Sequence, residues 1–308
     1  MTNRWTVHLV LVLLIGCTAA GCGGSGPGPA SAAPATLQVL LTLPTAELAT
    51  MDIARLNLLC TEGLPGNEET GIDSHLAQLD TWAVRVKAET ERHRYRFVRD
   101  PGEFEHSEGF FKMLMLGVVL AEDYGVQYRP EWRAVPEAAW AGDGFFADAR
   151  AVFLRGLLGA DRQGTCSSLP VLYVAVGRRL GYPLKLATTK GHLFVRWDGA
   201  GERFNLEVTG QGLNRYPDEY YRRWPFAVTE AEVAAEGYLE SLTPAGELAV
   251  FLSVRAMCLR EVGRMGEAGE AFGKAAQLAP GVASYLVMAT HCQEGAGQRR
   301  EVTQTRGG

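Results

Sequence analysis

The chain has 308 residues, of which 47% are hydrophobic and 21% are charged, which is the balance of an ordinary globular protein. Its formal net charge is −5 and no long run of Lys and Arg is present, so we do not expect nucleic acid as a partner. The spacing of Cys and His matches no zinc motif, and we expect neither a metal ion nor another cofactor.

The first 22 residues have the pattern of a bacterial lipoprotein signal peptide. Arg4 precedes an apolar run over residues 7–15, which is short for a membrane span and is followed by small residues. The pattern ends twice in a resemblance to a lipidation site, LIGC at Cys17 and AAGC at Cys22, of which Cys22 stands directly against the linker. Either cysteine predicts an exported protein that is lipid-anchored to a membrane of the cell envelope. Residues 23–36 are rich in Gly, Pro and Ala and are expected to be a flexible linker.

Residues 37–160 are predicted to form a mostly helical N-terminal segment. Apolar residues recur at helical spacing in three stretches, which are 47–60, 72–90 and 107–125. Acidic residues and a histidine lie before the third stretch, at Glu103, Glu105, His106 and Glu108. We interpret them as helix-capping and dipole-complementing residues rather than as metal ligands.

Residues 161–243 are predicted to form an α+β core, which begins with a helix over about 166–181 that opens with Cys166. A helix N-terminus favours a thiolate, and its N–H groups can face the oxyanion of an acyl intermediate. Thr165 is the expected N-cap, and Gly164 permits a close approach of the chain.

Pro170 adds a constraint to this helix. Its ring would crowd the carbonyl of Cys166 four residues earlier. We therefore expect either a distorted first turn or a regular helix that starts nearer Ser167. In both cases Cys166 lies at the helix mouth.

Three short stretches after this helix have the composition of strands, at 184–189, 192–197 and 203–208. In the second stretch, alternation places His192, Phe194 and Arg196 on one face and Leu193, Val195 and Trp197 on the other.

A hairpin between the second and third strands would bring a histidine to a carboxylate. If Asp198 pairs with Gly201 around a type II′ turn, Trp197 lies opposite Glu202, Arg196 opposite Arg203, and His192 opposite Glu207. Glu207 then accepts from one imidazole nitrogen and leaves the other nitrogen for a thiol. We predict a catalytic triad of Cys166, His192 and Glu207.

These residues carry a family resemblance. GTC at the start of a helix, then GHLFVRW, FNLEVTGQG and PDEYYRRW, resemble the bacterial transglutaminase-like cysteine hydrolase superfamily. The resemblance implies a papain/transglutaminase-like core, in which a Cys-bearing helix packs on a small antiparallel sheet. It also implies the three roles of nucleophile, base and orienting acid. Gln163 and the backbone N–H of Cys166 are the candidate oxyanion donors. The third role is more often held by Asp in that superfamily.

Residues 244–295 are predicted to form a helical tail that resembles a tetratricopeptide repeat. With Pro280 as the thirty-second position of a 34-residue repeat, five small or aromatic positions of the motif are matched, which are Ala256, Leu259, Ala268, Phe272 and Ala275. Cys258 and Cys292 are 34 residues apart and are expected to stay unpaired, because neighbouring helices lie farther apart than a disulfide spans. One repeat and a half is too short to stand alone, so the tail should pack on the core, and residues 296–308 are expected to be disordered.

Together these features predict a membrane-tethered cysteine hydrolase or acyltransferase that acts on amide bonds through a thioester. Its substrate would be a protein or peptide of the cell envelope, and the sequence does not separate hydrolysis from transamidation. The alternative is a catalytically inactive transglutaminase-like scaffold whose helical tail engages a protein partner. A redox role for Cys166 is less favoured, because no resolving cysteine lies near it in sequence.

Overall fold

The computed structural model describes residues 33–66, 71–133, 144–199, 201–210 and 212–306, with side chains up to residue 297. The predicted signal peptide, Cys17, Cys22 and most of the predicted linker lie outside the described residues. Residues 34–308 belong to one folded unit. None of the described helices has both the length and the hydrophobicity needed to cross a bilayer.

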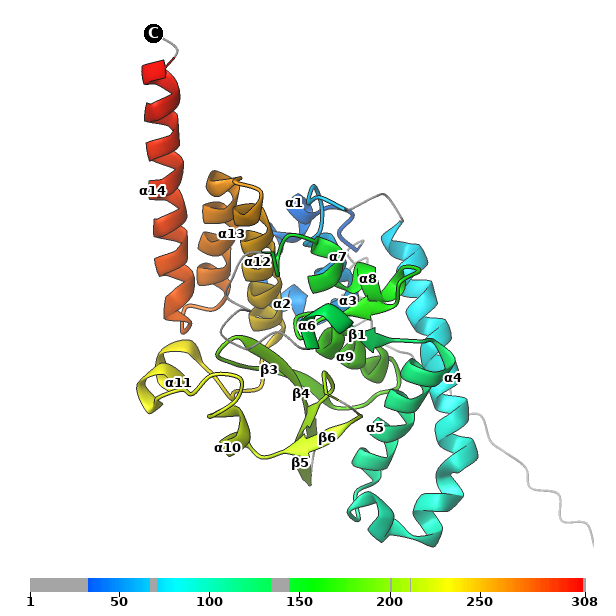
Figure 1. The fold of residues 1–308 in the computed structure, drawn as a ribbon. Helices are drawn as coiled ribbons and strands as arrows, with labels where there is room; N and C mark the ends of the chain where they lie inside the picture. The colour runs from blue at the N-terminus through cyan, green and yellow to red at the C-terminus, as the bar shows by residue number, and fades with distance from the viewer. Residues whose placement is uncertain (1–32, 67–70, 134–143, 200, 211, 307–308) are drawn as a thin grey trace, which may run out of the picture. The chain divides into compact units, whose positions relative to one another are not determined.

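The described part of the chain is α+β, with one antiparallel sheet among many helices (Figure 1). The α-helices are α1 (Leu37–Leu40), α2 (Thr45–Leu48), α3 (Ile53–Leu59), α4 (Ile72–Arg99), α5 (Glu108–Val118), α6 (Pro130–Arg133), α7 (Ala149–Val152), α8 (Leu154–Leu158), α9 (Leu169–Arg179), α10 (Asp218–Tyr221), α11 (Glu230–Glu236), α12 (Pro244–Glu261), α13 (Met265–Leu278) and α14 (Ala283–Arg306). The strands are β1 (Gln127–Tyr128), β2 (Gln163–Gly164), β3 (Leu184–Thr189), β4 (His192–Gly199), β5 (Glu202–Glu207) and β6 (Asn214–Tyr216). A 3-10 turn over Pro101–Phe104 and a π-helical turn over Val119–Asp123 flank α5.

The sheet has the strand order β3-β4-β5-β6, and every neighbouring pair is antiparallel. Helix α9 packs against β3 and β4, and its residues from Leu169 to Gly177 are all buried. Side chains of α9 and one face of β4 belong to the same hydrophobic core, to which Val176, Val195 and Leu206 contribute with no exposed surface. Helix α9 therefore lies on a small antiparallel sheet, and Cys166 precedes its first residue by three positions.

The helices of the N-terminal segment surround α9. Contacts join α9 to α3, α4, α5 and α8, and buried side chains such as Leu56, Leu79 and Leu116 complete the core around it. A buried polar contact also fixes two distant segments, since Oδ1 of Asn57 accepts from the backbone N–H of Leu154 at 3.0 Å. In the same region, the short strands β1 and β2 form a parallel pair, in which Gly164 of β2 lies opposite Tyr128.

The tail helices α12, α13 and α14 pack in sequence on one another and α12 contacts α2, α3 and α7, as expected. All five positions chosen by the repeat frame are buried. Arg178 at the end of α9 binds both carboxylate oxygens of Glu247, at 2.9 and 2.5 Å, and so joins the tail to the core. Cys258 and Cys292 are free thiols, which confirms that they stay unpaired.

Helix α14 continues to Arg306 and thus extends through most of the segment that we expected to be disordered. Residues 298–306 contain neither Gly nor Pro, and their Gln, Arg and Glu residues favour the helical state.

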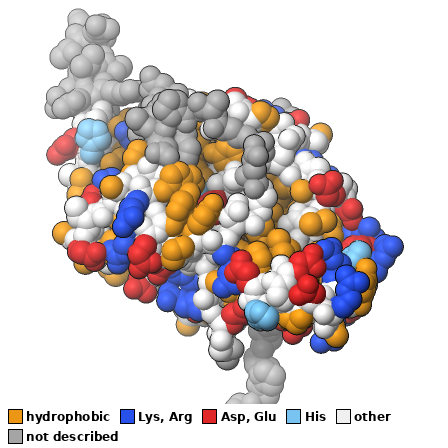
Figure 2. Space-filling model, turned by 60° about the horizontal axis from the view of Figure 1, so that its bottom comes forward, with side chains coloured by type: hydrophobic (Ala, Val, Ile, Leu, Met, Phe, Trp, Pro, Cys, Tyr) orange, Lys and Arg blue, Asp and Glu red, His pale blue; other side chains and the backbone are white. Residues whose placement is uncertain are grey.

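The acidic residues before α5 are engaged in capping and ion pairs. Ser107 is the N-cap of α5 and its Oγ accepts from the N–H of Phe110 at 2.8 Å. Glu103 pairs with Arg96, Glu105 with Arg215, and Glu108 with Lys112. The described residues contain no group of His, Cys, Asp and Glu arranged to hold a metal ion. On the face that is turned forward in Figure 2, acidic and basic side chains are interspersed.

Candidate active site

Cys166 lies in a turn that leads into α9. The regular helix begins at Leu169, two residues after Ser167, near which we expected it to start because of Pro170, and Pro170 occupies its first turn. This start suits proline, because the N–H groups of a first helical turn have no intrahelical acceptor. In the turn itself, the N–H groups of Ser168 and Leu169 donate to the carbonyl of Thr165, at 3.1 and 3.0 Å. Thr165 therefore does not cap α9, although its hydroxyl accepts from Ser167 at 3.3 Å within the turn.

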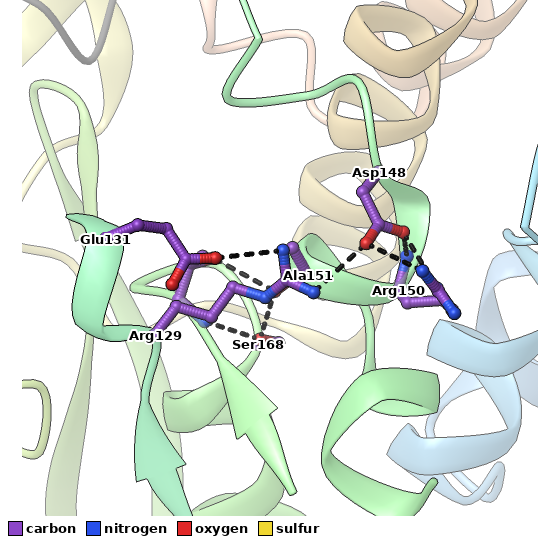
Figure 3. A network of polar contacts seen from close by, with 7 residues as sticks. Arg129, Glu131, Asp148, Arg150, Ala151 and Ser168 are labelled. Atoms are coloured by element: carbon purple, nitrogen blue, oxygen red, sulfur yellow. Dashed lines mark hydrogen bonds and ion pairs between the residues drawn. The ribbon is translucent and has the colours of Figure 1, made fainter. Parts of the chain in front are cut away.

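Two buried hydroxyl groups hold this turn against α7. The hydroxyls of Ser168 and Thr165 both donate to the carbonyl of Ala151, at 2.8 and 3.2 Å, and Ser168 also accepts from the N–H of Thr165 at 3.0 Å (Figure 3). Helix α7 is held in turn by its N-cap Asp148, whose carboxylate accepts from Arg150 and Arg129 (Figure 3). The position of the thiol is thus set by contacts that are all internal to the fold.

Gly164 is the residue that lets the chain pass this close, as its place before Cys166 led us to expect. A Cβ at this position would lie 2.5 Å from Oγ of Ser168 and 2.9 Å from the methyl carbons of Leu157.

We therefore expect Gly164→Ala to destabilise the fold by about 1–3 kcal/mol through overpacking and to slow modification of Cys166 by displacing its turn. Urea unfolding and the alkylation rate of Cys166 measure the two effects. Gly266→Ala in helix α13, where a Cβ meets nothing within 4 Å, is the matched control; it should leave the alkylation rate unchanged and keep or slightly raise the stability, because alanine favours the helix. A Gly164→Ala protein with normal stability and normal alkylation would show that the turn adapts.

The β4-β5 hairpin has a different register from the predicted one. Gly199 pairs with Glu202, and the ladder continues with Asp198 opposite Arg203, Trp197 opposite Phe204, and Arg196 opposite Asn205. The strand pairing thus reaches Gly199 and Glu202, whereas we predicted that Asp198 and Gly201 would be its last pair. The physical reason is the position of the glycine with positive φ, because Gly201 has φ +86° and takes the turn position that other residues adopt at a cost.

The shift removes the awkward pairing of two arginines and keeps the predicted faces. The observed register differs from the predicted one by two residues, so that Arg196 lies opposite Asn205 instead of Arg203. Because a shift of two residues keeps every side chain on its face, His192 and Glu207 remain on one face of the sheet. They are diagonal neighbours rather than direct partners. Diagonal neighbours have Cα atoms about 7–8 Å apart, a gap that a glutamate side chain can bridge.

His192 and Glu207 are in contact. Nε2 of His192 lies 2.8 Å from Oε2 of Glu207, and neither side chain has more than 4% of its surface exposed. The other oxygen, Oε1, accepts from the N–H and the hydroxyl of Thr209 at 2.8 and 2.5 Å. The carboxylate is therefore fixed on both sides, with one oxygen directed at the imidazole.

The imidazole of His192 also lies next to Cys166, since both residues line the same cleft. Within the described residues, Nδ1 of His192 is buried and has no partner of normal hydrogen-bond geometry, while the thiol of Cys166 interacts with the ring. The structure thus brings the three residues together in the order thiol, imidazole and carboxylate. A gap of this kind between nucleophile and base is usual before substrate binds.

Burial lowers the pKa of His192, but the charge of Glu207 and the contact with Cys166 outweigh it and raise the pKa to about 10. Burial also raises the pKa of Glu207, and here His192 and the two donors of Thr209 outweigh it, so that the net pKa is lowered. Both shifts favour an imidazolium beside a carboxylate. An imidazolium that persists through neutral pH stabilises a thiolate next to it.

Aromatic side chains enclose the imidazole. The ring of Trp224 meets that of His192 edge-on at 4.6 Å, and Tyr221 stacks on Phe194 at 3.9 Å while its hydroxyl donates to Glu207 at 3.5 Å. Side chains of the segment 214–226 therefore cover the hairpin around His192. Arg196 holds this segment in place. Its guanidinium donates to Asn205, to the carbonyl of Leu239 and to Asp218, each at 2.6–2.7 Å. The Arg196 residue itself has no exposed surface.

A cleft of about 540 Å³ opens above Cys166 and His192. One side is formed by Cys166, Ser167 and the β3-β4 turn, and the other by the loop after α11 and by α12, α13 and α14. The thiol thus faces a space of the size that small-molecule and peptide groups occupy in proteins.

Gln163, the other predicted oxyanion donor, lies in β2 opposite Gln127 and is not among the residues that line the cleft. The backbone N–H of Cys166 is engaged in none of the hydrogen bonds described for its turn. Of the two candidates, the backbone N–H of Cys166 is therefore the one that lies at the cleft and can donate a hydrogen bond to an oxyanion.

No protein-family model matches this chain, and no curated protein shows significant similarity to it. The argument for function therefore stands on the residues of the site.

Several residues of this site escaped sequence reasoning. Thr209 follows the strand that carries Glu207, and a hydroxyl two residues after a candidate acid was the only available signal. The cleft wall formed by the tail helices had no signal in the sequence, because it depends on how α12 docks against the core.

Proposed function

We propose that this protein is a cysteine hydrolase or acyltransferase of the transglutaminase-like type, acting on amide bonds of proteins or peptides in the cell envelope. The observation that carries the proposal is a buried imidazole that contacts Glu207 at 2.8 Å through one nitrogen and lines the same cleft as Cys166, with which its ring interacts. A lone buried thiol is usually structural, but a thiol, a histidine and a carboxylate in this order are the elements of an activated nucleophile.

In the proposed reaction, the thiolate of Cys166 attacks the amide carbonyl carbon, and the carbonyl electron pair moves to the oxygen. The C–N bond then breaks, and the imidazolium of His192 transfers its proton to the departing amine. Water or a second amine attacks the resulting thioester, His192 accepts the proton of this nucleophile, and the thiolate leaves. Glu207 keeps the ring oriented and stabilises its charge throughout, and the N–H of Cys166 is the proposed donor to the oxyanion.

The test is the alkylation of Cys166 by iodoacetamide at pH 6, measured by peptide mass spectrometry. We expect Cys166 to react at least about tenfold faster than glutathione, because a thiolate paired with an imidazolium is the reactive form. The protein supplies internal controls, since Cys60 and Cys258 are buried and burial raises the pKa of each to about 12. These two thiols should not be labelled.

His192→Ala should slow the labelling of Cys166 by about 10²-fold, while His291→Ala, at an exposed position of α14, should have no effect. Labelling of Cys166 at the rate of an ordinary thiol, or equal rates in both histidine variants, would refute the proposal and favour a non-catalytic scaffold. With an active wild type, incorporation of a labelled amine into casein indicates transfer, whereas release of ammonia or amine without such incorporation indicates hydrolysis.

A further inference from the structure

The tail helices supply one wall of the candidate active site. Val250, Ser253 and Val254 of α12 line the cleft together with Tyr285 of α14. These residues are half-buried, so each side chain presents part of its surface to the cleft. Phe146 and Phe226 add aromatic surface from other segments. Half-buried apolar side chains that converge on a concave surface are typical of a site for an apolar ligand group.

Several polar groups of this wall are engaged within the protein. The hydroxyl of Ser253 donates to the carbonyl of Val250 at 2.8 Å and also bonds with Tyr285. Ser284 donates through its hydroxyl to Glu236 at 2.6 Å, and Thr189 donates to the carbonyl of Tyr221 at 2.7 Å. What these residues leave for a ligand is mainly apolar surface.

Apart from His192, the charged side chains that line the cleft are all acidic. Among the described residues that line it there is no Lys or Arg, whereas Glu236 and Glu240 both lie on its border. Apart from the imidazolium of His192, which is paired with Glu207, a negatively charged group in the cleft would therefore meet only carboxylates, which disfavours acidic ligands.

From this composition we infer that the cleft is a specificity pocket for a bulky apolar side chain next to the reacting carbonyl, and that Val250 and Val254 of α12 determine this preference. The inference rests on the proposed function, since it names the substrate class of the same site. It assigns the tail helices to substrate selection. The cleft has a volume of about 540 Å³, which lies within the range of about 300–1,000 Å³ that is usual for ligand pockets. An aromatic side chain that entered it would have about 150–250 Å² of surface to bury.

The experiment uses N-acetyl amino-acid chloromethyl ketones with a Phe, Leu, Gly or Asp side chain. In each case the thiolate of Cys166 displaces chloride and forms a thioether, and the second-order rate is divided by that of the same probe with glutathione. We expect the Phe and Leu probes to react at least about tenfold faster than the Gly probe, as partial burial of one apolar side chain implies. The Asp probe should be the slowest.

Val250→Trp fills the cleft and should remove the preference for Phe over Gly; the iodoacetamide rate of Cys166 in the same variant is measured in parallel and corrects for any change in access to the thiol. Val254→Phe is a second variant with a smaller change in volume, in case the first does not fold. Val84→Trp, at a valine with 71% of its surface exposed on α4, is the matched control and should keep the full preference.

The outcomes separate the two proposals. Equal rates for the four probes, or a preference that survives both cleft variants, would overturn the specificity pocket although Cys166 stays reactive towards iodoacetamide. Slow reaction with iodoacetamide itself would instead overturn the proposed function.

Discussion

Glu207→Gln is expected to cost about 3–5 kcal/mol of folding free energy and to slow alkylation of Cys166 by at least about tenfold. The substitution keeps the size of the side chain but removes its charge, which leaves a buried imidazolium without its partner. The carboxylate has 4% of its surface exposed, so solvent cannot replace it. Urea unfolding at pH 5.5 measures the first effect. Glu219→Gln, at an exposed position of α10, should stay within about 0.5 kcal/mol.

The loss should depend on pH in a defined direction. Because the pKa of His192 is raised in the folded state, its contribution is complete below the unfolded value of about 6.5 and disappears as the pH rises through about 10. Because the pKa of Glu207 is lowered, its contribution is present above the unfolded value of about 4.3 and disappears as the pH falls through the folded value. The stability difference should therefore be largest between about pH 4.5 and 6.5 and shrink towards pH 10. A difference that grows with rising pH would contradict the ion pair.

Glu207→Asp tests whether the length of the acidic side chain matters in addition to its charge. The shorter acid keeps its charge but cannot span the diagonal between the two strands, so it should recover only part of the stability and of the alkylation rate. Full recovery would mean that direct contact with His192 is not needed. The diagonal register thus gives a physical reason for a glutamate, rather than the shorter aspartate, at this position.

Arg196→Met should cost about 3–5 kcal/mol and loosen the cover over His192. Arg196 is fully buried, and its loss leaves Asn205, the carbonyl of Leu239 and Asp218 without their common donor. We expect a lower midpoint of urea unfolding together with faster hydrogen exchange over residues 216–226. The methionine retains most of the apolar volume, so the effect reports on the polar contacts.

Arg203→Met is the control on the neighbouring strand. Its side chain is 53% exposed and its nearest carboxylate oxygen, on Asp198, is 3.7 Å away. An exposed pair of this kind contributes about 0–1 kcal/mol. Equal losses for Arg196→Met and Arg203→Met would show that the buried network does not hold the segment over the histidine.

Local sequence was sufficient for the elements that carry the candidate site. The sequence predicted a helix over about 166–181 and strands at 184–189, 192–197 and 203–208, and the structure contains α9, β3, β4 and β5 at these places, with α9 starting only at Leu169. Alternation also predicted that His192 shares a face with Arg196, since side chains of a strand alternate regardless of its partner. The need for glycine at position 164 and the buried positions of the tail helices followed from equally local rules.

The tertiary structure decided the features that depend on residues far apart in the chain. The register of the hairpin shifted by two because Gly201, rather than Gly199, takes the turn position with positive φ. The start of α9 moved to Leu169 because the carbonyl of Ala151 anchors the preceding turn. The apolar wall at Val250 and Val254 exists only because α12 docks beside the turn of Cys166. Sequence by itself determined which side chains point to the same face, since that follows from backbone periodicity. Distances between these faces arise from long-range packing, which no local pattern encodes.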